Sequence, residues 1–117
     1  MALQISEKQI DGVTILDFVG RITLGDESNQ VRIKIKEVLG KGKSQIVLDL
    51  AGVSYIDSAG LGMLMAGYAS AQNQGATLKL ANLTKKFHEL LNITRLVTIF
   101  DTYDSVDAAV KSFAKEA

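Results

Sequence analysis

The sequence has no cysteine, no proline, no tryptophan and a single histidine, His88. Without cysteine the chain has no disulfide bonds, no thiolate ligands for a metal and no cysteine nucleophile. One imidazole also excludes any metal site built on two histidines. Thirteen basic and thirteen acidic side chains balance to a net charge of zero, which argues against a nucleic-acid surface or an electrostatic membrane contact. We therefore expect a protein partner, and neither a metal nor a cofactor.

The length of 117 residues and the hydrophobic content of 47% are typical of one soluble domain with its own core, so we expect a single domain over residues 1–117. Residues 1–8 lack the basic cluster and apolar run of a secretory signal, which predicts a cytoplasmic protein. Residues 58–78 carry no charge. Glycines and amide side chains interrupt this stretch, however, so it predicts a soluble helix and no membrane insertion.

Hydrophobic periodicity divides the chain into alternating strands and helices. Alternation around Asp11-Gly12 predicts an N-terminal β-hairpin. The next elements are expected to be a helix capped by Asp26 and ended by Gly40, a strand at 45–50, a turn at 51–52, an extended piece at 53–56, a helix at 58–74, a strand at 77–80, a short helix capped by Thr84, a strand at 96–100 and a helix capped by Asp104. Helices that alternate with strands act as crossovers. The sequence therefore predicts an α/β fold with a mixed sheet of about five strands and about four helices.

Two catalytic patterns are present only in part. Residues 40–44, Gly-Lys-Gly-Lys-Ser, imitate the end of a phosphate-binding loop, but Glu37 stands where the first glycine is required, and a helix precedes the turn where a strand is required. Ser58 follows a strand as in a serine hydrolase, but the motif lacks its first glycine, and His88 is expected on the surface of a short helix. The sequence predicts no active site, and we do not expect an enzyme.

The segment 55–67, Tyr-Ile-Asp-Ser-Ala-Gly-Leu-Gly-Met-Leu-Met-Ala-Gly, has two interpretations. The plain one is that Asp57 or Ser58 caps a helix. The functional one starts from the outer face of that helix, which carries no charge where charges are the norm. The stripe of the helix that is expected to face the core consists of Leu61, Leu64, Met65, Tyr68 and Gln72. A separate stripe of small residues consists of Gly62, Ala66 and Ser70, beside Met63 and Gly67. An uncharged exposed face of this kind is typical of a docking site.

Ser58 is well placed for a covalent switch at this face. Phosphorylation would add about 1.5 to 2 negative charges and three acceptor oxygens. The dipole and free amides of the first helical turn would tolerate the phosphate, so we expect the fold to survive. A docked partner would be disturbed, because the interface would have to desolvate the phosphate next to the Asp57 carboxylate. A loss of about 2.8 kcal/mol would weaken binding a hundredfold.

The run Asp57-Ser58-Ala59-Gly60-Leu61-Gly62, after an apolar strand, resembles the Asp-Ser-Ser/Thr/Ala-Gly-Leu-Gly signature of the STAS domain in bacterial anti-sigma factor antagonists. The segments 13–20, 46–50, 92–100 and 104–106 support a resemblance that covers essentially the whole chain. It implies a partner-switching regulator of transcription. In such systems the unphosphorylated antagonist binds an anti-sigma factor that is also a serine protein kinase, and this frees the sigma factor. The kinase phosphorylates the serine that corresponds to Ser58, and a protein serine phosphatase resets it; ATP and magnesium would belong to the kinase.

The resemblance and the uncharged face together assign phosphorylation to Ser58 and partner binding to Thr23, Asp57, Ser58, Ala59, Gly60, Gly62, Met63 and Ala66. One position departs from the family pattern. Many members carry an acidic residue in the loop after the second strand, following Gly-x-Leu, whereas here Gly20-Arg21-Ile22 is followed by Thr23. Some STAS domains are never phosphorylated and serve as scaffold subunits of signalling complexes or of lipid transporters. That role is the alternative, and the oligomeric state is left open.

Overall fold

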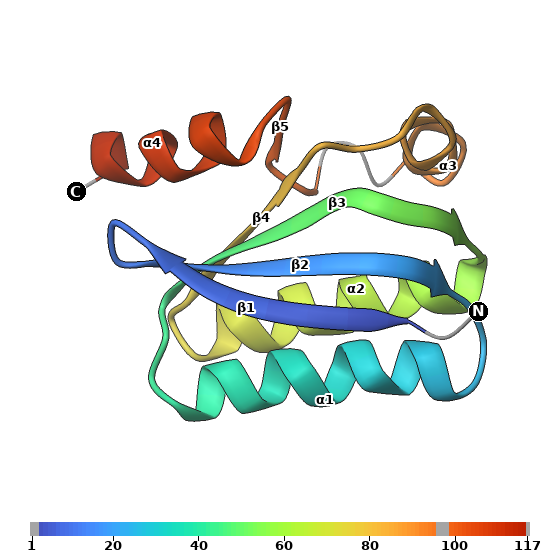
Figure 1. The fold of residues 1–117 in the computed structure, drawn as a ribbon, viewed down its shortest axis with the longest axis horizontal. Helices are drawn as coiled ribbons and strands as arrows, with labels where there is room; N and C mark the ends of the chain where they lie inside the picture. The colour runs from blue at the N-terminus through green and yellow to red at the C-terminus, as the bar shows by residue number, and fades with distance from the viewer. Residues whose placement is uncertain (1–2, 96–98, 117) are drawn as a thin grey trace.

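The computed structural model describes residues 3–95 and 99–116. Its elements follow in the order β1 (Gln4–Ile10), β2 (Val13–Ile22), α1 (Asp26–Gly40), β3 (Gln45–Ile56), α2 (Ser58–Asn73), β4 (Thr77–Ala81), α3 (Lys85–Ile93), β5 (Thr102–Tyr103) and α4 (Val106–Glu116). Within the described residues the strands form one sheet in the order β1-β2-β3-β4-β5 (Figure 1). β1 is antiparallel to β2, and the other neighbours are parallel. The expected α/β fold with a mixed sheet of five strands and four helices is confirmed.

The N-terminal hairpin turns at Asp11 and Gly12, as its sequence predicts. Both residues have positive φ angles, 51° and 81°, which is the conformation that a two-residue hairpin turn requires at its two central positions. The strands pair directly on either side of the turn, with Ile10 opposite Val13. The hairpin therefore fixes the register of β1 on β2.

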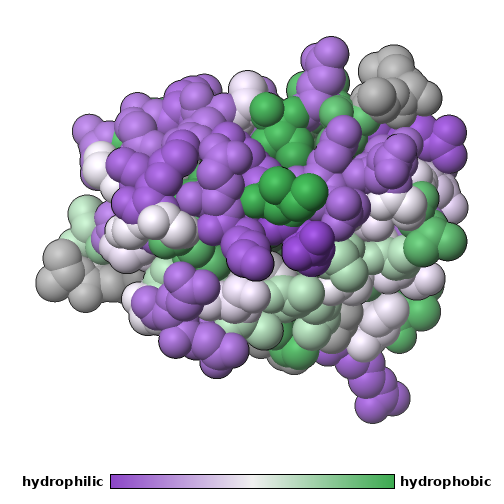
Figure 2. Space-filling view, turned by 90° about the horizontal axis from the view of Figure 1, so that it is seen from below, coloured by the Kyte–Doolittle hydropathy of each residue, from purple (hydrophilic) through white to green (hydrophobic). Residues whose placement is uncertain are grey.

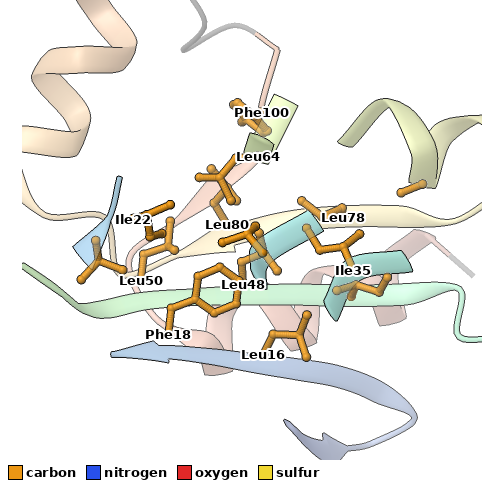
Figure 3. Close-up of a cluster of buried hydrophobic side chains, with 14 of the residues drawn as sticks. Leu16, Phe18, Ile22, Ile35, Leu48, Leu50, Leu64, Leu78, Leu80 and Phe100 are labelled. Atoms are coloured by element: carbon orange, nitrogen blue, oxygen red, sulfur yellow. The ribbon is translucent and has the colours of Figure 1, made fainter. Parts of the chain in front are cut away.

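The sheet separates two hydrophobic clusters. α1 and α2 lie side by side on one face of the sheet, and α4 covers part of the other face (Figure 1). Alternate residues of the three central strands point toward α1 and α2 and form the larger cluster with residues of both helices: Leu16, Phe18, Leu48, Leu50, Leu78 and Leu80 with Ile35 and Leu64 (Figure 3). The intervening residues Ile15 and Val47 pack on the other side with Val110 and Phe113. Burial on both faces explains the nearly continuous apolar run at 46–50.

The strand boundaries differ from the sequence-based prediction in two places. The expected turn at 51–52 is wrong, because β3 continues through it to Ile56. The pairing with β2 is irregular there, and a Cβ atom on Gly52 would lie 2.7 Å from the Phe18 carbonyl oxygen, so Gly52 serves a close strand contact. Of the strand expected at 96–100, residues 96–98 lie outside the described residues. The paired strand is β5, and Phe100 precedes it with its ring 5.3 Å from that of Tyr68 on α2.

The caps of α1, α3 and α4 confirm one prediction and correct two. Thr84 caps α3 and accepts a hydrogen bond from the Phe87 amide at 3.2 Å. α1 has Gly25 at its N-cap position, and Asp26 lies in the first turn. At the start of α4 it is the hydroxyl of Ser105, one residue after the predicted Asp104, that accepts from the Ala108 amide at 3.0 Å. Both corrections shift the helix start by a single residue, which is within the usual uncertainty of helix ends.

Candidate functional site

The candidate site is formed where β3 ends and α2 begins. Asp57 stands between the two elements in an extended conformation and caps the helix. Its Oδ1 atom accepts a hydrogen bond from the Gly60 amide at 2.8 Å, and its Oδ2 atom accepts one from the Leu24 amide at 3.0 Å. The Asp57 amide in turn donates to the Ile22 carbonyl at 3.3 Å. One residue therefore ties the first turn of α2 to the end of β2 and to the loop that follows it.

These hydrogen bonds also set the charge at the site. The Gly60 amide, followed by the Leu24 amide, holds the pKa of the Asp57 carboxyl below its ordinary value, because both donors stabilise the ionised form. Asp57 is therefore a carboxylate at neutral pH. Any phosphate on the neighbouring Ser58 would add to a negative charge that is already fixed in place.

The next turn of α2 lies very close to β2. A Cβ atom on Gly60 would overlap the carbonyl group of Ile22. Gly60 is buried, so the structure gives it a packing role: it lets the start of α2 approach the end of β2. A Cβ atom on Gly62, by contrast, would meet nothing within 4 Å. The two glycines of the signature therefore lie on opposite sides of the helix.

The outer side of α2 is exposed and carries no charge. We call it the neutral face and define it by its exposed residues Ser58, Gly62, Ala66, Ala69 and Ser70. Figure 2 shows this side of the molecule, with strongly hydrophilic residues over α1 in the upper part and white to pale green residues over α2 in the lower part. The predicted line of small residues at 62, 66 and 70 is confirmed as exposed.

Other predicted residues of α2 and its surroundings are distributed differently. Thr23, Asp57, Ala59 and Met63 are half-buried beside the neutral face. Gly67, which the sequence places beside the small residues, is buried against Ile35 of α1. The buried side of α2 contains Gly60, Leu61, Leu64, Gly67 and Ala71, whereas Gln72, expected there, is exposed. Small residues are thus needed on the inner side of α2 as well, because α1 packs closely there.

Sequence reasoning missed Leu24. This side chain is 77% exposed, and it lies in the β2–α1 loop that the Asp57 carboxylate holds. The Thr23 and Gly25 carbonyls accept hydrogen bonds from the amides of Ser28 and Asn29, both at 3.1 Å, so the loop is fixed at both ends. Leu24 could have been found from the sequence, because it is an apolar residue between Thr23 and Gly25 that lies outside every predicted strand and helix.

The two partial catalytic patterns stay incomplete in the structure. Residues 40–44 join the end of α1 to the start of β3, which is the reverse of a phosphate-binding loop. His88 is exposed on α3, as expected. Across residues 3–95 and 99–116, no group of three histidine, aspartate or glutamate side chains is placed to hold a metal ion. No helix in the same residues is long and apolar enough to cross a membrane.

A family model described as the STAS domain matches residues 4–109 of the chain. The chain belongs to the STAS domain family. The match covers the hairpin, the site at Asp57 and all elements up to the first turn of α4, so the signature at 57–62 lies well inside the matched region.

Two relatives and one solved structure place this STAS domain among similar proteins. The anti-sigma F factor antagonist of Paenibacillus polymyxa is 28% identical over 90% of this chain and 90% of its own length. The anti-sigma-B factor antagonist of Bacillus subtilis is 30% identical over 86% of this chain and 91% of its own. A structure of the Bacillus cell fate determinant SpoIIAA in the phosphorylated form has a TM-score of 0.73 at 14% identity, over 94% of this chain and 99% of that one. The last comparison shows a shared fold.

Proposed function

We propose that this STAS domain, over residues 1–117, is an anti-sigma factor antagonist that switches partners through phosphorylation of Ser58. Unphosphorylated, it binds an anti-sigma factor that is also a serine protein kinase; phosphorylated, it is released, and a protein serine phosphatase restores it. The observation that carries this proposal is the position of Ser58, exposed in the first turn of α2 at one end of the neutral face. Such a switch would operate in the cytoplasm, where sigma factors act, and the chain itself would catalyse no reaction.

The physical basis of the switch is a charge placed on an uncharged surface. A partner that covers the neutral face has no ionised side chain of α2 to desolvate. Phosphorylation would add about 1.5 to 2 negative charges beside the Asp57 carboxylate, and a bound partner would have to desolvate both groups. The start of α2 would stay folded, because its dipole and its first amides stabilise an anion.

The predicted partner-binding residues have two different roles in this proposal. Ser58, Gly62 and Ala66 are exposed and would contact the partner directly, with the half-buried Ala59 and Met63 at the margin. Asp57 and Gly60 would act by positioning, since they hold the start of α2 against β2. Thr23 precedes Leu24 in the β2–α1 loop, and the Leu24 amide donates a hydrogen bond to the Asp57 carboxylate.

The relatives support the proposal in two ways. Both curated relatives are named as antagonists of anti-sigma factors. The SpoIIAA structure is of a phosphorylated form, so in that protein a domain of this fold carries a phosphate. The second candidate function is a permanent scaffold subunit of a signalling complex or a lipid transporter. It is favoured by Thr23, which stands where many antagonists have an acidic residue.

The decisive test uses the anti-sigma factor kinase from the same organism as the chain. Wild type, Ser58→Ala and Ser58→Asp are compared by calorimetric titration, with Gln72→Glu as a control that adds one negative charge at an exposed residue of α2 outside the neutral face. We expect the kinase with ATP to phosphorylate wild type at Ser58 and not Ser58→Ala. We expect Ser58→Asp to stay folded and to lose binding at least a hundredfold, about 2.8 kcal/mol. Unchanged binding of Ser58→Asp, with a single unmodified mass in cells, would favour the scaffold.

A further inference from the structure

The two flanks of α1 are charged in different ways. On the flank toward β1, Lys34 Nζ lies 2.9 Å from Glu7 and 3.2 Å from Glu37. Lys41 lies 3.2 Å from Glu7 and completes this network. On the flank toward α2, Arg32 and Lys36 are exposed, and neither forms an ion pair with any residue that the structure describes. The charge of α1 is therefore compensated on one flank only.

A groove of about 250 Å³ runs between this second flank and α2. Arg32 and Lys36 form one wall, and Ala66 and Ser70 of α2 belong to the other. Ile35 and Leu39 of α1 also line the groove, but they are only 1% and 6% exposed. Gly67 makes the close contact of the two helices, since a Cβ atom there would come within 2.5 Å of the Ile35 Cδ1 atom. The groove thus has a basic wall and an uncharged wall, and the apolar residues between them are buried.

The groove continues the neutral face. Ala66 and Ser70 belong to both, so a partner that covers α2 from Ser58 onward reaches the groove without a gap. Arg32 and Lys36 are four residues apart on α1 and therefore project from the same side of the helix. The Asn29 side-chain oxygen accepts hydrogen bonds from Arg32 Nε at 3.2 Å and Arg32 Nη2 at 2.9 Å. This contact orients the guanidinium group but leaves its charge uncompensated.

We propose that this groove binds an acidic, amphipathic segment of the same partner that binds at Ser58 and phosphorylates it. Acidic side chains of the segment would face Arg32 and Lys36, and small apolar ones would lie against the exposed Ala66. The inference rests on the proposed function, because it takes the partner to be the anti-sigma factor kinase. It assigns a second contact, well along α2 from the switch, in which charge complementarity selects the partner and speeds its association.

The test is a charge reversal with a matched control. Arg32→Glu with Lys36→Glu reverses the basic wall. Lys8→Glu with Lys85→Glu makes the same change of net charge at exposed residues of β1 and α3. Binding of the anti-sigma factor kinase is measured at low and at high salt. We expect the groove variant to raise Kd on the order of tenfold to a hundredfold and to lose most of the salt dependence, whereas the control stays close to wild type.

Each other outcome has a defined meaning. If the groove variant binds like wild type while Ser58→Asp no longer binds, the groove proposal is wrong and the switch stands. If both charge variants weaken binding equally, the effect is one of net charge, and the groove proposal is again wrong. If Ser58→Asp binds normally, the proposed function itself fails. A second test identifies the bound segment with a photo-crosslinking amino acid at position 70. The segment of the kinase that it captures must contain aspartate or glutamate, and a segment without acidic residues would contradict the proposal.

Discussion

α1 and α2 lie side by side on the same face of the sheet, yet their outer surfaces are opposite in character (Figure 2). α1 exposes Arg32, Lys36 and Glu37, whereas α2 exposes only small or uncharged residues. Both helices bury apolar side chains in the same cluster, so the core does not explain the difference. The proposed contact with another protein would use this difference, since an exposed surface without charges is typical of a docking site.

The largest effect on stability is expected from replacing a glycine of α2 by alanine, and it should differ between the two glycines on opposite sides of the helix. Gly60→Ala should destabilise the fold by about 2 to 3 kcal/mol, because the new methyl group overlaps the Ile22 carbonyl. Gly62→Ala, the matched control, should stabilise it by about 0.5 to 1 kcal/mol, because the methyl group has free space and alanine favours helix. Urea unfolding measures both. Equal effects would mean that the two sides of α2 do not differ as described.

The contact between the two helices can be tested at Gly67. Gly67→Ala should cost about 1 kcal/mol, because its methyl group meets the Ile35 Cδ1 atom at 2.5 Å. Ile35→Val removes that atom and by itself should also cost about 1 kcal/mol. The double variant should lose clearly less than the sum of the two, since valine makes room for the alanine. Additive losses in urea unfolding would contradict the close packing of α1 on α2.

The capping aspartate should make stability depend on pH. The pKa of Asp57 is lowered in the folded state from an ordinary value of 3.8, so its contribution is complete above that ordinary value and is lost as pH falls through the folded pKa. At neutral pH, Asp57→Asn should therefore be less stable than wild type by about 1 kcal/mol, because its side chain has one acceptor oxygen for the two amides of Gly60 and Leu24. The gap should narrow as the pH is lowered below the ordinary value of 3.8 and through the folded pKa. A gap that stays constant with pH would exclude this role of the carboxylate.

The smallest effect is expected from the ion pairs that join Glu7 of β1 to Lys34 and Lys41. The pKa of Glu7 is lowered, first by its hydrogen bond with Lys34 and further by the one with Lys41. These groups lie at the surface, so Glu7→Gln should cost only about 0.5 kcal/mol, and about 1 M salt should remove the difference. Thermal unfolding at two salt concentrations measures this. A loss as large as that of Gly60→Ala would mean that surface charge does hold the fold together.

Sequence patterns predicted most of the fold because the signals are local. The hairpin turn at Asp11-Gly12, the cap at Thr84 and the helix that starts at Asp57-Ser58 each depend on a few adjacent residues. The errors arise where a contact with a distant segment decides: Ala51-Gly52 is typical of a turn, but Gly52 serves a close approach to Phe18 on the neighbouring strand. No pattern in the sequence predicted the burial of Lys79. It is fully buried, its Nζ atom donates to the Ser112 hydroxyl at 2.7 Å, and it lies 4.2 Å from the ring centre of Phe113.

The sequence by itself determined the order of the elements, the capping aspartate, the position of Ser58 and the absence of charge on α2. These properties follow from composition, period and short motifs, which act over one or two turns of chain. Only the tertiary structure decided that Asp57 holds Leu24, 33 residues earlier in the chain, and that Gly60 and Gly62 face opposite ways. It also decided that Arg32 and Lys36 of α1 line a groove beside the neutral face. Such relations depend on how β2, α1 and α2 pack together, and no local pattern in the sequence records the distance between residues that folding brings into contact.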